Sequence, residues 1–352
     1  MSSSAWGDVE TQYFVSLTPD RILDAVEASG LRCTGRCLQL NSMENRVYEI
    51  EIILDEDVVV TSPSDRFRVV KFYRPGRWSK EQILDEHQFL LDLQAEDLPV
   101  AAPERFPDGQ TLHCLGDLSI YYCVFPKFGG RNPDELSVDQ LEQLGRLYAR
   151  VHNVGALRPA SHRLTLNPTT YGLDNLRYIL EEKLLPPEHQ RPYRDLVEAL
   201  CKHTDPWFAK TPIQRVHGDA HLGNLLWHPD RGPRLVDFDD MVMGPPVQDI
   251  WLATPGRDAW SLQEREILLE GYEQMRDFDR QSLRLIEPLR ALRFVHFHAW
   301  IGKRWKDQAF PRAFPQYGTP NYWAEAVNDL REQLRLIQET SSSHPMHHMS
   351  DI

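Results

Sequence analysis

Three polar residues near the middle of the chain, Asp219, Asn224 and Asp237, have types and spacing that suit a site for a hard cation. The first two lie in the run VHGDAHLGNLLW and the third lies in LVDFDD, with apolar residues on either side. Mg²⁺ takes oxygen ligands, usually one or two carboxylates together with substrate phosphates. Asn224 and Asp237 can supply a carbonyl oxygen and a carboxylate, which leaves Asp219 to orient a hydroxyl nucleophile and accept its proton. These roles predict phosphoryl transfer, whose catalysis is mostly positioning and charge neutralisation.

The spacing also matches the catalytic loop of protein kinases, in which four residues separate an Asp from an Asn and a metal-binding Asp follows. Asp219 and Asn224 have this separation, and Asp237 is followed by an aromatic residue. The pair of segments HGDAHLGNLLW and VDFDD resembles the catalytic core of the kinase-like phosphotransferases, which include aminoglycoside phosphotransferases, choline kinases and homoserine kinases. Members of this superfamily carry His-Gly-Asp where protein kinases carry His-Arg-Asp.

A narrower resemblance is to the bacterial stress response kinases within that superfamily. It rests on segments spread over residues 39–315: LNSMENRVYEI, VVKFYRPGRWS, ILDEHQFLLDL, PVAAP, GPPVQDIW and IEPLRALR. The resemblance implies an α+β, two-lobed protein-kinase-like fold, with a β-rich N-lobe, a helical C-lobe, and ATP with Mg²⁺ in the cleft between them. It also implies that the acceptor is a Ser or Thr of protein and that the setting is the stress response.

A site of this kind needs a Lys on the third strand to hold the α- and β-phosphates, and a Glu on the next helix to fix that Lys. Lys71 in the apolar run FRVVKFY and Glu86 in SKEQILDEHQFLLDL meet these two requirements. Two alternatives stay open: Lys71 lies on a solvated strand face, or Glu81 takes the place of Glu86 as its partner.

The turn expected to cover the ATP phosphates lacks the glycine-rich pattern of protein kinases. The run NSMEN forms the turn of a predicted hairpin, and the resemblance places Ser42 near the phosphates. Backbone N–H groups and the side chains of Ser42 and Asn45 can contact phosphate without glycine. The alternative is a polar turn with no further role. Residues 125–130 are the predicted hinge, whose backbone would hydrogen-bond adenine between apolar side chains that include Phe125 and Phe128.

Other polar residues are expected to support the catalytic loop. The resemblance identifies Asp249 in PPVQDIW as an Asp that braces the loop, and His217 is expected to hydrogen-bond the surrounding backbone. His217, His221 and His228 suggest zinc as an alternative, but zinc needs three protein ligands with ordered partners, and these His lie on what reads as a loop. Asp239 either binds a second Mg²⁺ or caps a turn.

Hydrophobic periodicity and turn residues predict the elements that position these groups. Strands are expected in two runs within 37–53, at 67–73, within 116–125 and as two short apolar strands in the stretch that contains Asp219 and Asp237. Helices are expected at about 19–29, 79–93, 137–154, 174–185, 192–202, 261–276, 281–305 and 321–338. The predicted organisation is an N-terminal helical extension (1–30), a β-rich N-lobe (31–125), a helical C-lobe (126–338) and a disordered tail (339–352). The Arg290 and Arg293 helix either lines the acceptor cleft or places its arginines in water or beside acids.

Composition narrows the partners and the compartment. The net charge of −13 disfavours nucleic acid or an anionic membrane as the main partner. Five scattered cysteines suit a reduced, intracellular protein, with little support for a metal site at Cys33 and Cys37. The chain shows neither a signal peptide nor a run of about 18 apolar residues. A cytoplasmic monomer is therefore expected.

Two rival functions remain. One is a small-molecule kinase, because the HGDxHxxN motif is shared with enzymes that phosphorylate antibiotics, choline and amino alcohols. Only eleven residues separate Asp237 from Asp249, whereas a protein kinase normally uses a longer segment as a peptide platform. The other rival is a non-catalytic nucleotide-binding protein, which the complete set of Lys, Glu, Asp, Asn and Asp argues against. A Ser hydrolase is disfavoured because the sequence has no G-x-S-x-G elbow.

Overall fold

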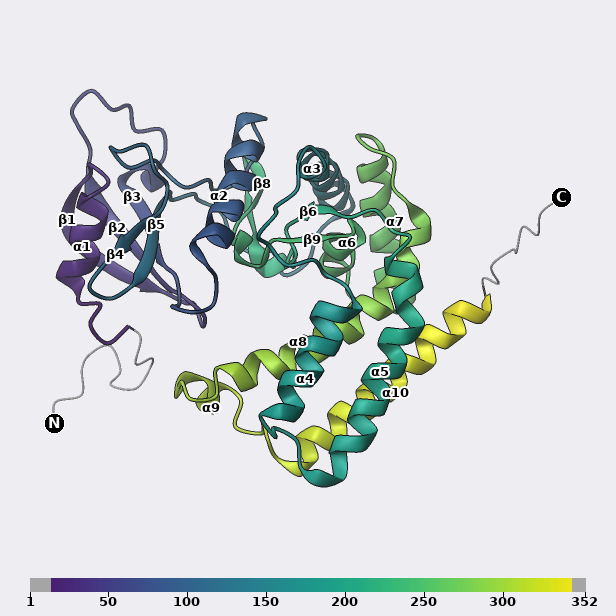
Figure 1. Cartoon of the computed structure of the whole chain (residues 1–352). Coiled ribbons are helices and arrows are strands. Elements are labelled where there is room, and N and C mark those ends of the chain that lie inside the picture. The colour runs from purple at the N-terminus through teal and green to yellow at the C-terminus, as the bar shows by residue number, and fades with distance from the viewer. Residues whose placement is uncertain (1–13, 344–352) are drawn as a thin grey trace. The chain divides into compact units, whose positions relative to one another are not determined.

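The computed structural model describes residues 14–343, which form two compact units. One unit comprises the chain up to Arg163 together with Gln214–Phe278, and the other comprises Leu164–Ile213 and the chain from Asp279 onward. The predicted combination of helices with an antiparallel N-terminal sheet is confirmed (Figure 1). Each unit combines two segments that are separated in the sequence, so the units do not correspond to the predicted lobes. The lobe boundary expected between residues 125 and 126 therefore stays a prediction.

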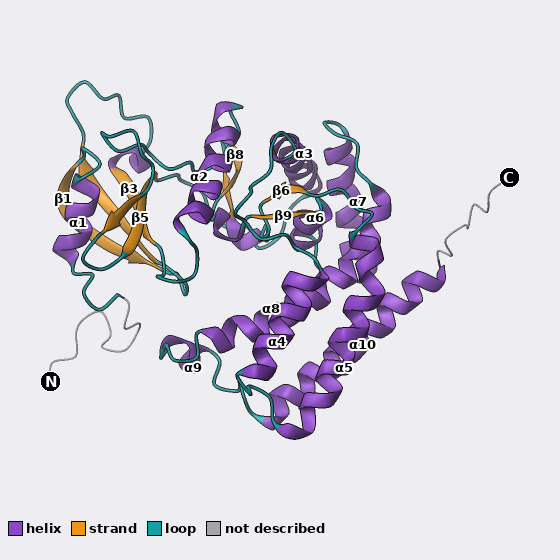
Figure 2. Cartoon of the chain, viewed as in Figure 1, coloured by secondary structure: helices purple, strands orange, loops and turns teal. Residues whose placement is uncertain are grey.

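A five-stranded antiparallel sheet in the order β1-β2-β3-β5-β4 forms the N-terminal part of the first unit (Figure 2). Its strands are β1 (Arg32–Leu40), β2 (Arg46–Ile53), β3 (Phe67–Phe72), β4 (His113–Leu115) and β5 (Ile120–Pro126). The predicted hairpin is β1 and β2, joined at NSMEN. In β3, Lys71 lies opposite Val47 of β2 and Cys123 of β5, so a central strand carries the predicted phosphate-binding Lys.

Apolar side chains on alternate positions of the sheet pack against helix α1 (Pro19–Glu27). Ile50, Val70 and Phe72 are fully buried, and they share one core cluster with Ile22 and Val26 of the helix. Because strand side chains alternate between faces, the same pattern that buries Val70 and Phe72 puts Lys71 on the opposite face. The sheet core thereby fixes the direction in which the Lys71 side chain leaves the strand.

The first unit contains four further α-helices, of which the short α6 was not predicted from the sequence. They are α2 (Lys80–Ala95), α3 (Val138–Gly155), α6 (Val247–Ala253) and α7 (Ala259–Glu273). Ser79 and Ser137 each accept a backbone N–H in the first turn, and a Gln three residues later bonds back to the Ser backbone, which completes two capping boxes. Helices α3 and α7 pack closely at Gly145, where an added Cβ would lie 2.0 Å from the Leu268 carbonyl oxygen.

Short strands flank the segments that carry Asp219, Asn224 and Asp237. They are β6 (Gln214–Val216), β7 (Leu225–His228), β8 (Gly232–Leu235) and β9 (Val242–Gly244). Strand β6 pairs with β9, and β7 pairs with β8. Sequence patterns predicted two short strands in this region. The other two were missed because a run of three or four residues is too short to show a period.

The second unit is built from helices around an aromatic core. Its α-helices are α4 (Asp174–Glu181), α5 (Pro187–Phe208), α8 (Ile286–Lys303), α9 (Ala309–Ala313) and α10 (Pro320–Ser343). Tyr193 of α5 hydrogen-bonds His298 of α8 at 2.9 Å, and its ring contacts the fully buried Trp323 of α10. Helix α5 is twice as long as the predicted 192–202, because Pro192 and Pro206 lie inside it rather than at its ends.

Two predictions concern the ends of the chain: the N-terminal helical extension (1–30) and the disordered tail (339–352). Helix α10 continues to Ser343, so residues 339–343 of the predicted disordered tail are helical. Residues 1–13 and 344–352 lie outside the described range, and so does most of the predicted tail. Among the described helices, none combines the length and the apolar character that a membrane span requires.

Candidate active site

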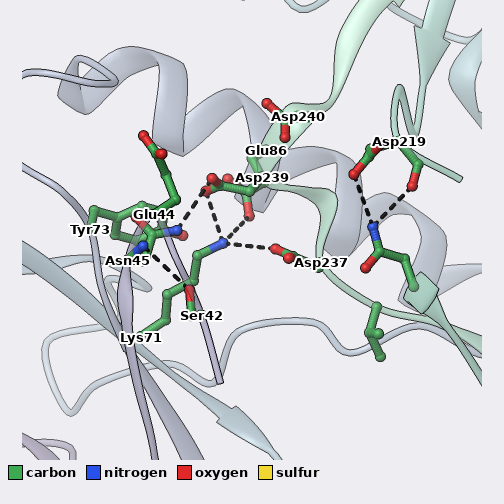
Figure 3. A network of polar contacts seen from close by, with 12 residues as sticks. Ser42, Glu44, Asn45, Lys71, Tyr73, Glu86, Asp219, Asp237, Asp239 and Asp240 are labelled. Atoms are coloured by element: carbon green, nitrogen blue, oxygen red, sulfur yellow. Dashed lines mark hydrogen bonds and ion pairs between the residues drawn. The ribbon is translucent and has the colours of Figure 1, made fainter. Parts of the chain in front are cut away.

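Lys71 lies among three carboxylates that come from distant parts of the sequence (Figure 3). Its ammonium nitrogen is 2.8 Å from Asp239, 3.4 Å from Asp237 and 3.7 Å from Glu86. Burial alone would lower the pKa of Lys71, but Asp239, Glu86 and Asp237 outweigh it and raise the pKa above its ordinary value. The side chain is 7% exposed, so the alternative of a solvated strand face is wrong.

Glu86 of α2 lies within ion-pair distance of Lys71, while Glu81 is exposed in the first turn of the same helix. Glu86 is also held by Arg163, which donates to its second carboxylate oxygen at 2.9 Å. Burial raises the pKa of Glu86 above its ordinary value despite the opposing effect of Lys71. Arg163 was not anticipated, because no local pattern in the sequence marks an arginine 77 positions from its partner.

The catalytic loop folds so that Asp219 and Asn224 contact each other. The Asn224 amide nitrogen donates to the Asp219 carbonyl oxygen at 2.9 Å and to its carboxylate at 3.3 Å. Tyr148 of α3 donates its hydroxyl hydrogen to the Ala220 carbonyl oxygen, which ties the loop to the helix below it. His221 accepts the Gly223 N–H at Nδ1, and its Nε2 lies 3.3 Å from the Asp219 carboxylate.

Asp249 of α6 is completely buried and accepts three hydrogen bonds beneath this loop. The backbone N–H groups of His217 and Gly218 donate to its two oxygens at 2.9 Å, and His152 Nε2 lies 3.0 Å away. These bonds support the bracing role that the resemblance predicts for Asp249, which stays a prediction. Gly218 has φ +84°, and an added Cβ would lie 2.2 Å from the Asp240 carbonyl oxygen, so glycine is required at this position.

Both ring nitrogens of His217 are engaged by backbone groups. Nε2 donates to the Val236 carbonyl oxygen at 3.0 Å, and Nδ1 accepts the Asp219 N–H at 3.3 Å. A nitrogen that donates its hydrogen to a carbonyl has no lone pair for a metal, so the zinc alternative at His217 is wrong. His217 instead joins the segment before Asp237 to the segment that carries Asp219.

Asp237 has a left-handed backbone, with φ 60° and ψ 64°. This conformation is uncommon for a residue with a side chain and is found more often at functional sites. The carboxylate is 58% exposed, whereas Lys71 beside it is buried. The N–H of the preceding Val236 donates to the Asn224 carbonyl oxygen at 3.0 Å, so the two residues predicted to hold a cation lie on adjoining segments.

Ser42 lies in the turn between β1 and β2, where its hydroxyl oxygen accepts the Asn45 N–H at 3.3 Å. The Asn45 side chain donates to Asp239 at 3.2 Å and accepts the Arg74 N–H at 3.0 Å. The turn is therefore tied by side chains to two other segments of the unit. The sequence predicts Asn45 as a contact of the ATP phosphates, but it does not predict the hydrogen bonds of Asn45 with Asp239 and Arg74.

The predicted hinge residues occupy different environments. Phe125 is the second-to-last residue of β5, where it lies opposite Val69 of β3, and it is partly buried. The Phe128 ring is covered by the Arg234 guanidinium, whose carbon lies 3.5 Å from the ring centroid. Arg131, just beyond the hinge, exchanges two backbone hydrogen bonds with Trp227 of β7.

Asp239 is 3% exposed, and it is the residue whose surroundings differ most from the sequence expectation. Besides Lys71 and Asn45, its carboxylate contacts the guanidinium of Arg77. Burial opposes ionisation of Asp239, but Arg77 and Lys71 outweigh burial and hold its pKa below the ordinary value. It is thus an ion-pair partner of protein cations, which neither the second-metal nor the turn-cap interpretation included.

The arginines of the predicted acceptor helix lie on α8 of the second unit. Arg290 forms an ion pair with Glu287 one turn earlier at 3.4 Å, and Arg293 is exposed. Lys303 donates to Asn175 of α4 at 3.2 Å. These contacts agree with the interpretation that the helix places its cations beside acids, polar partners and water.

Residues 43–286 match the model of the family described as the phosphotransferase enzyme family. Stress response kinase A of Escherichia coli strain K12 is 39% identical over 330 residues, which cover 93% of this chain and 95% of the relative. A relative from Salmonella typhimurium strain LT2, named serine/threonine protein kinase RdoA, is 38% identical over 327 residues, with the same coverage of 93% and 95%.

Solved structures with a similar fold include kinases named for small molecules. Amicoumacin kinase in complex with AMP-PNP, Ca²⁺ and Ami has a TM-score of 0.66 at 19% identity, with 90% of this chain and 94% of that chain covered. Spectinomycin phosphotransferase in complex with ADP and spectinomycin has a TM-score of 0.60 at 13% identity, with 92% and 98% covered. These similarities confirm the predicted kinase-like fold class.

Proposed function

This chain belongs to the phosphotransferase enzyme family, and we propose that it is an ATP- and Mg²⁺-dependent kinase that transfers the γ-phosphoryl group to Ser or Thr hydroxyls of protein. The observation that carries the proposal is the geometry around Lys71. A buried ammonium lies 3.4 Å from the exposed carboxylate of Asp237, and Asp237 adjoins the Asp219–Asn224 pair. A cation, an exposed carboxylate and a second carboxylate in one site are the parts that phosphoryl transfer needs.

In the proposed reaction, Asp219 orients the acceptor hydroxyl and accepts its proton. The hydroxyl oxygen forms the new bond to the γ-phosphorus, the bond from that phosphorus to the β,γ-bridging oxygen breaks, and ADP leaves. The bond from Asn224 holds the Asp219 carboxylate in one orientation. Asp249 keeps the loop in place from below, because it binds the two backbone N–H groups before Asp219.

The donor set around Asp237 fits a hard cation. Asn224 uses its amide nitrogen on Asp219, which leaves its amide oxygen as the donor for a metal, and the Asp237 carboxylate is mostly exposed. Mg²⁺ held by these two oxygens would neutralise the charge that develops on the transferred phosphoryl group. Lys71 binds the α- and β-phosphates in the proposal and is positioned by Glu86.

Three more residues complete the proposed ATP site. Ser42 in the β1–β2 turn contacts the phosphates, as the resemblance implies, and the Asn45 bond to Asp239 supports this by fixing the turn. Phe125 and Phe128 contribute apolar surface to adenine in the hinge. A role in the stress response is part of the same proposal and is supported by the names of the relatives. The proposal also includes a cytoplasmic monomer, as expected from the composition of the chain.

A small-molecule kinase is the second candidate. Only eleven residues separate Asp237 from Asp249, and the helical turn Phe238–Asp240, β9 and the start of α6 occupy eight of them. This leaves little chain for the peptide platform that a protein kinase normally builds after its metal-binding Asp. The protein acceptor is preferred because a relative that matches 93% of the chain is named a serine/threonine protein kinase.

The acceptor can be identified with purified protein, labelled ATP and Mg²⁺. One reaction contains a generic Ser/Thr substrate protein, and parallel reactions contain an aminoglycoside, choline or homoserine. Each is repeated with Asp219→Ala. Label on protein Ser or Thr that is absent from the variant supports the proposal. Label on a small molecule alone identifies the second candidate. ATP binding without transfer to any acceptor, equal in both proteins, would point to a non-catalytic nucleotide-binding protein.

A further inference from the structure

Lys71 shares each of its two buried carboxylates with an arginine. Glu86 turns one oxygen to Lys71 and the other to Arg163, at 3.7 and 2.9 Å. Asp239 turns Oδ1 to Lys71 at 2.8 Å and Oδ2 to Arg77. The side chains of these five residues are at most 9% exposed, so their charges interact through little water. Interactions between charges in such surroundings are much stronger than they are at the surface.

Arg77, like Lys71, lies within ion-pair distance of three carboxylates, one of which is Asp239. Its guanidinium also lies 2.6 Å from Asp240 and 3.4 Å from Glu44, which itself lies in the β1–β2 turn. The guanidinium carbon is 5.2 Å from the centroid of the Trp78 ring, and the Arg163 guanidinium contacts the same ring at 4.5 Å. Arg77 is therefore fixed between the turn that carries Ser42 and the segment that follows Asp237.

We propose that Arg77 is a positioning residue that governs how tightly Asp239 holds Lys71, and through this how well Lys71 can bind the phosphates of ATP. The inference rests on the proposed function, in which Lys71 contacts those phosphates. Asp239 and the ATP phosphates compete for one ammonium group. Arg77 supplies Asp239 with a second cation, so that Lys71 can turn to the phosphates without leaving a buried carboxylate unpaired.

Loss of Arg77 is expected to tighten the hold of Asp239 on Lys71. Of the two described cations that form ion pairs with the Asp239 carboxylate, Lys71 would be left, and Arg163 acts on this carboxylate from farther away. Removal of one partner from a buried charge network leaves an uncompensated charge, which is strongly unfavourable. Lys71 would then be held on Asp239, and ATP would have to displace a stronger interaction. The Asn45 bond to Asp239 places the β1–β2 turn under the same influence.

The test compares Arg77→Met, Asp239→Asn and the double variant, with the Kd of a fluorescent ATP analogue in the presence of Mg²⁺ as the main readout. Arg77→Met is expected to raise the Kd by about tenfold or more, which corresponds to about 1.4 kcal/mol. The double variant is expected to bind better than Arg77→Met alone, because the neutral Asn no longer retains Lys71. Arg77→Lys, which keeps the charge, is expected to restore most of the affinity.

Arg335→Met is the matched control. Arg335 also forms ion pairs with two carboxylates, Glu332 and Glu339, but it lies exposed on α10 of the second unit, and its loss is expected to leave the Kd unchanged. A purely structural role of Arg77 predicts that the double variant binds no better than the single one, and that result overturns the inference. The inference also fails if Arg77→Met folds and binds with the wild-type Kd. If the wild-type protein itself does not bind the analogue, the proposed function fails instead.

Discussion

Asp249 offers the sharpest test of how the catalytic loop is held. Its carboxylate is fully buried and accepts hydrogen bonds from the His217 and Gly218 N–H groups and from His152. Hydrogen bonds to a charged group contribute about 1.5–3 kcal/mol each, so three such bonds correspond to about 4–9 kcal/mol. Asp249→Ala removes all three and leaves buried donors without an acceptor. We expect a loss of about 5 kcal/mol or outright failure to fold, since whole domains are stable by about 5–15 kcal/mol.

The milder variant Asp249→Asn keeps one acceptor oxygen but turns an amide nitrogen toward the remaining donors. We expect it to lose about 2 kcal/mol in the free energy of unfolding, measured by urea denaturation. The control is Asp258→Ala in the same unit. Asp258 also accepts two backbone N–H groups, at the exposed start of α7, and such caps contribute only about 1 kcal/mol. An Asp249→Ala protein within about 1 kcal/mol of the wild type would refute the reasoning.

Three further predictions follow from single residues. Gly218→Ala should destabilise the first unit and abolish phosphoryl transfer, because Gly218 has φ +84° and the new methyl group would lie 2.2 Å from the Asp240 carbonyl oxygen. A variant with the wild-type free energy of unfolding in urea would contradict this. Burial lowers the pKa of His298 from 6.5 to about 3, so the folded state keeps it neutral while the unfolded chain binds a proton below pH 6.5. His298 should therefore contribute a fall in stability of about 1.4 kcal/mol between pH 7.5 and 5.5. His298→Gln should reduce the pH slope of the free energy of unfolding by this amount, while His87, whose pKa burial also lowers to about 3, keeps its own contribution; an unchanged slope would contradict this. Asp237→Ala should remove the Mg²⁺ dependence of ATP binding, measured by titration with and without the metal, and unchanged dependence would argue against its metal role.

Local patterns were sufficient where a residue and its partner lie close in sequence. The predicted helix at 79–93 begins with a capping box of Ser79 and Gln82, two residues that belong to one turn. The pattern of Asp219 and Asn224 is equally local, and the structure places the two side chains in contact. The strand position of Lys71 followed from the apolar residues around it, since alternation fixes the face to which a strand side chain points.

The contacts of the site that the sequence did not predict are ion pairs between residues far apart in the chain. Arg77 meets Asp239 across 162 positions, and Arg163 meets Glu86 across 77. Such pairs leave no periodic signal, so the sequence supplied Glu86 as the partner of Lys71 but not the closer Asp239. The run KFYRPGRW contains Arg77 and was recognised as characteristic of a subfamily, although one sequence alone does not say which carboxylate this arginine would meet.

The proposed reaction depends most directly on Asp219 as the residue that accepts the proton of the acceptor hydroxyl. The measurement is the rate of phosphoryl transfer from ATP by Asp219→Asn beside the wild type, with the ATP Kd and urea stability of both proteins determined in parallel. The account predicts a transfer rate lower by a factor of about 10²–10⁴, which is the usual contribution of a general base, with an ATP Kd within a few-fold of the wild type. A variant that transfers phosphate at the wild-type rate would contradict the account.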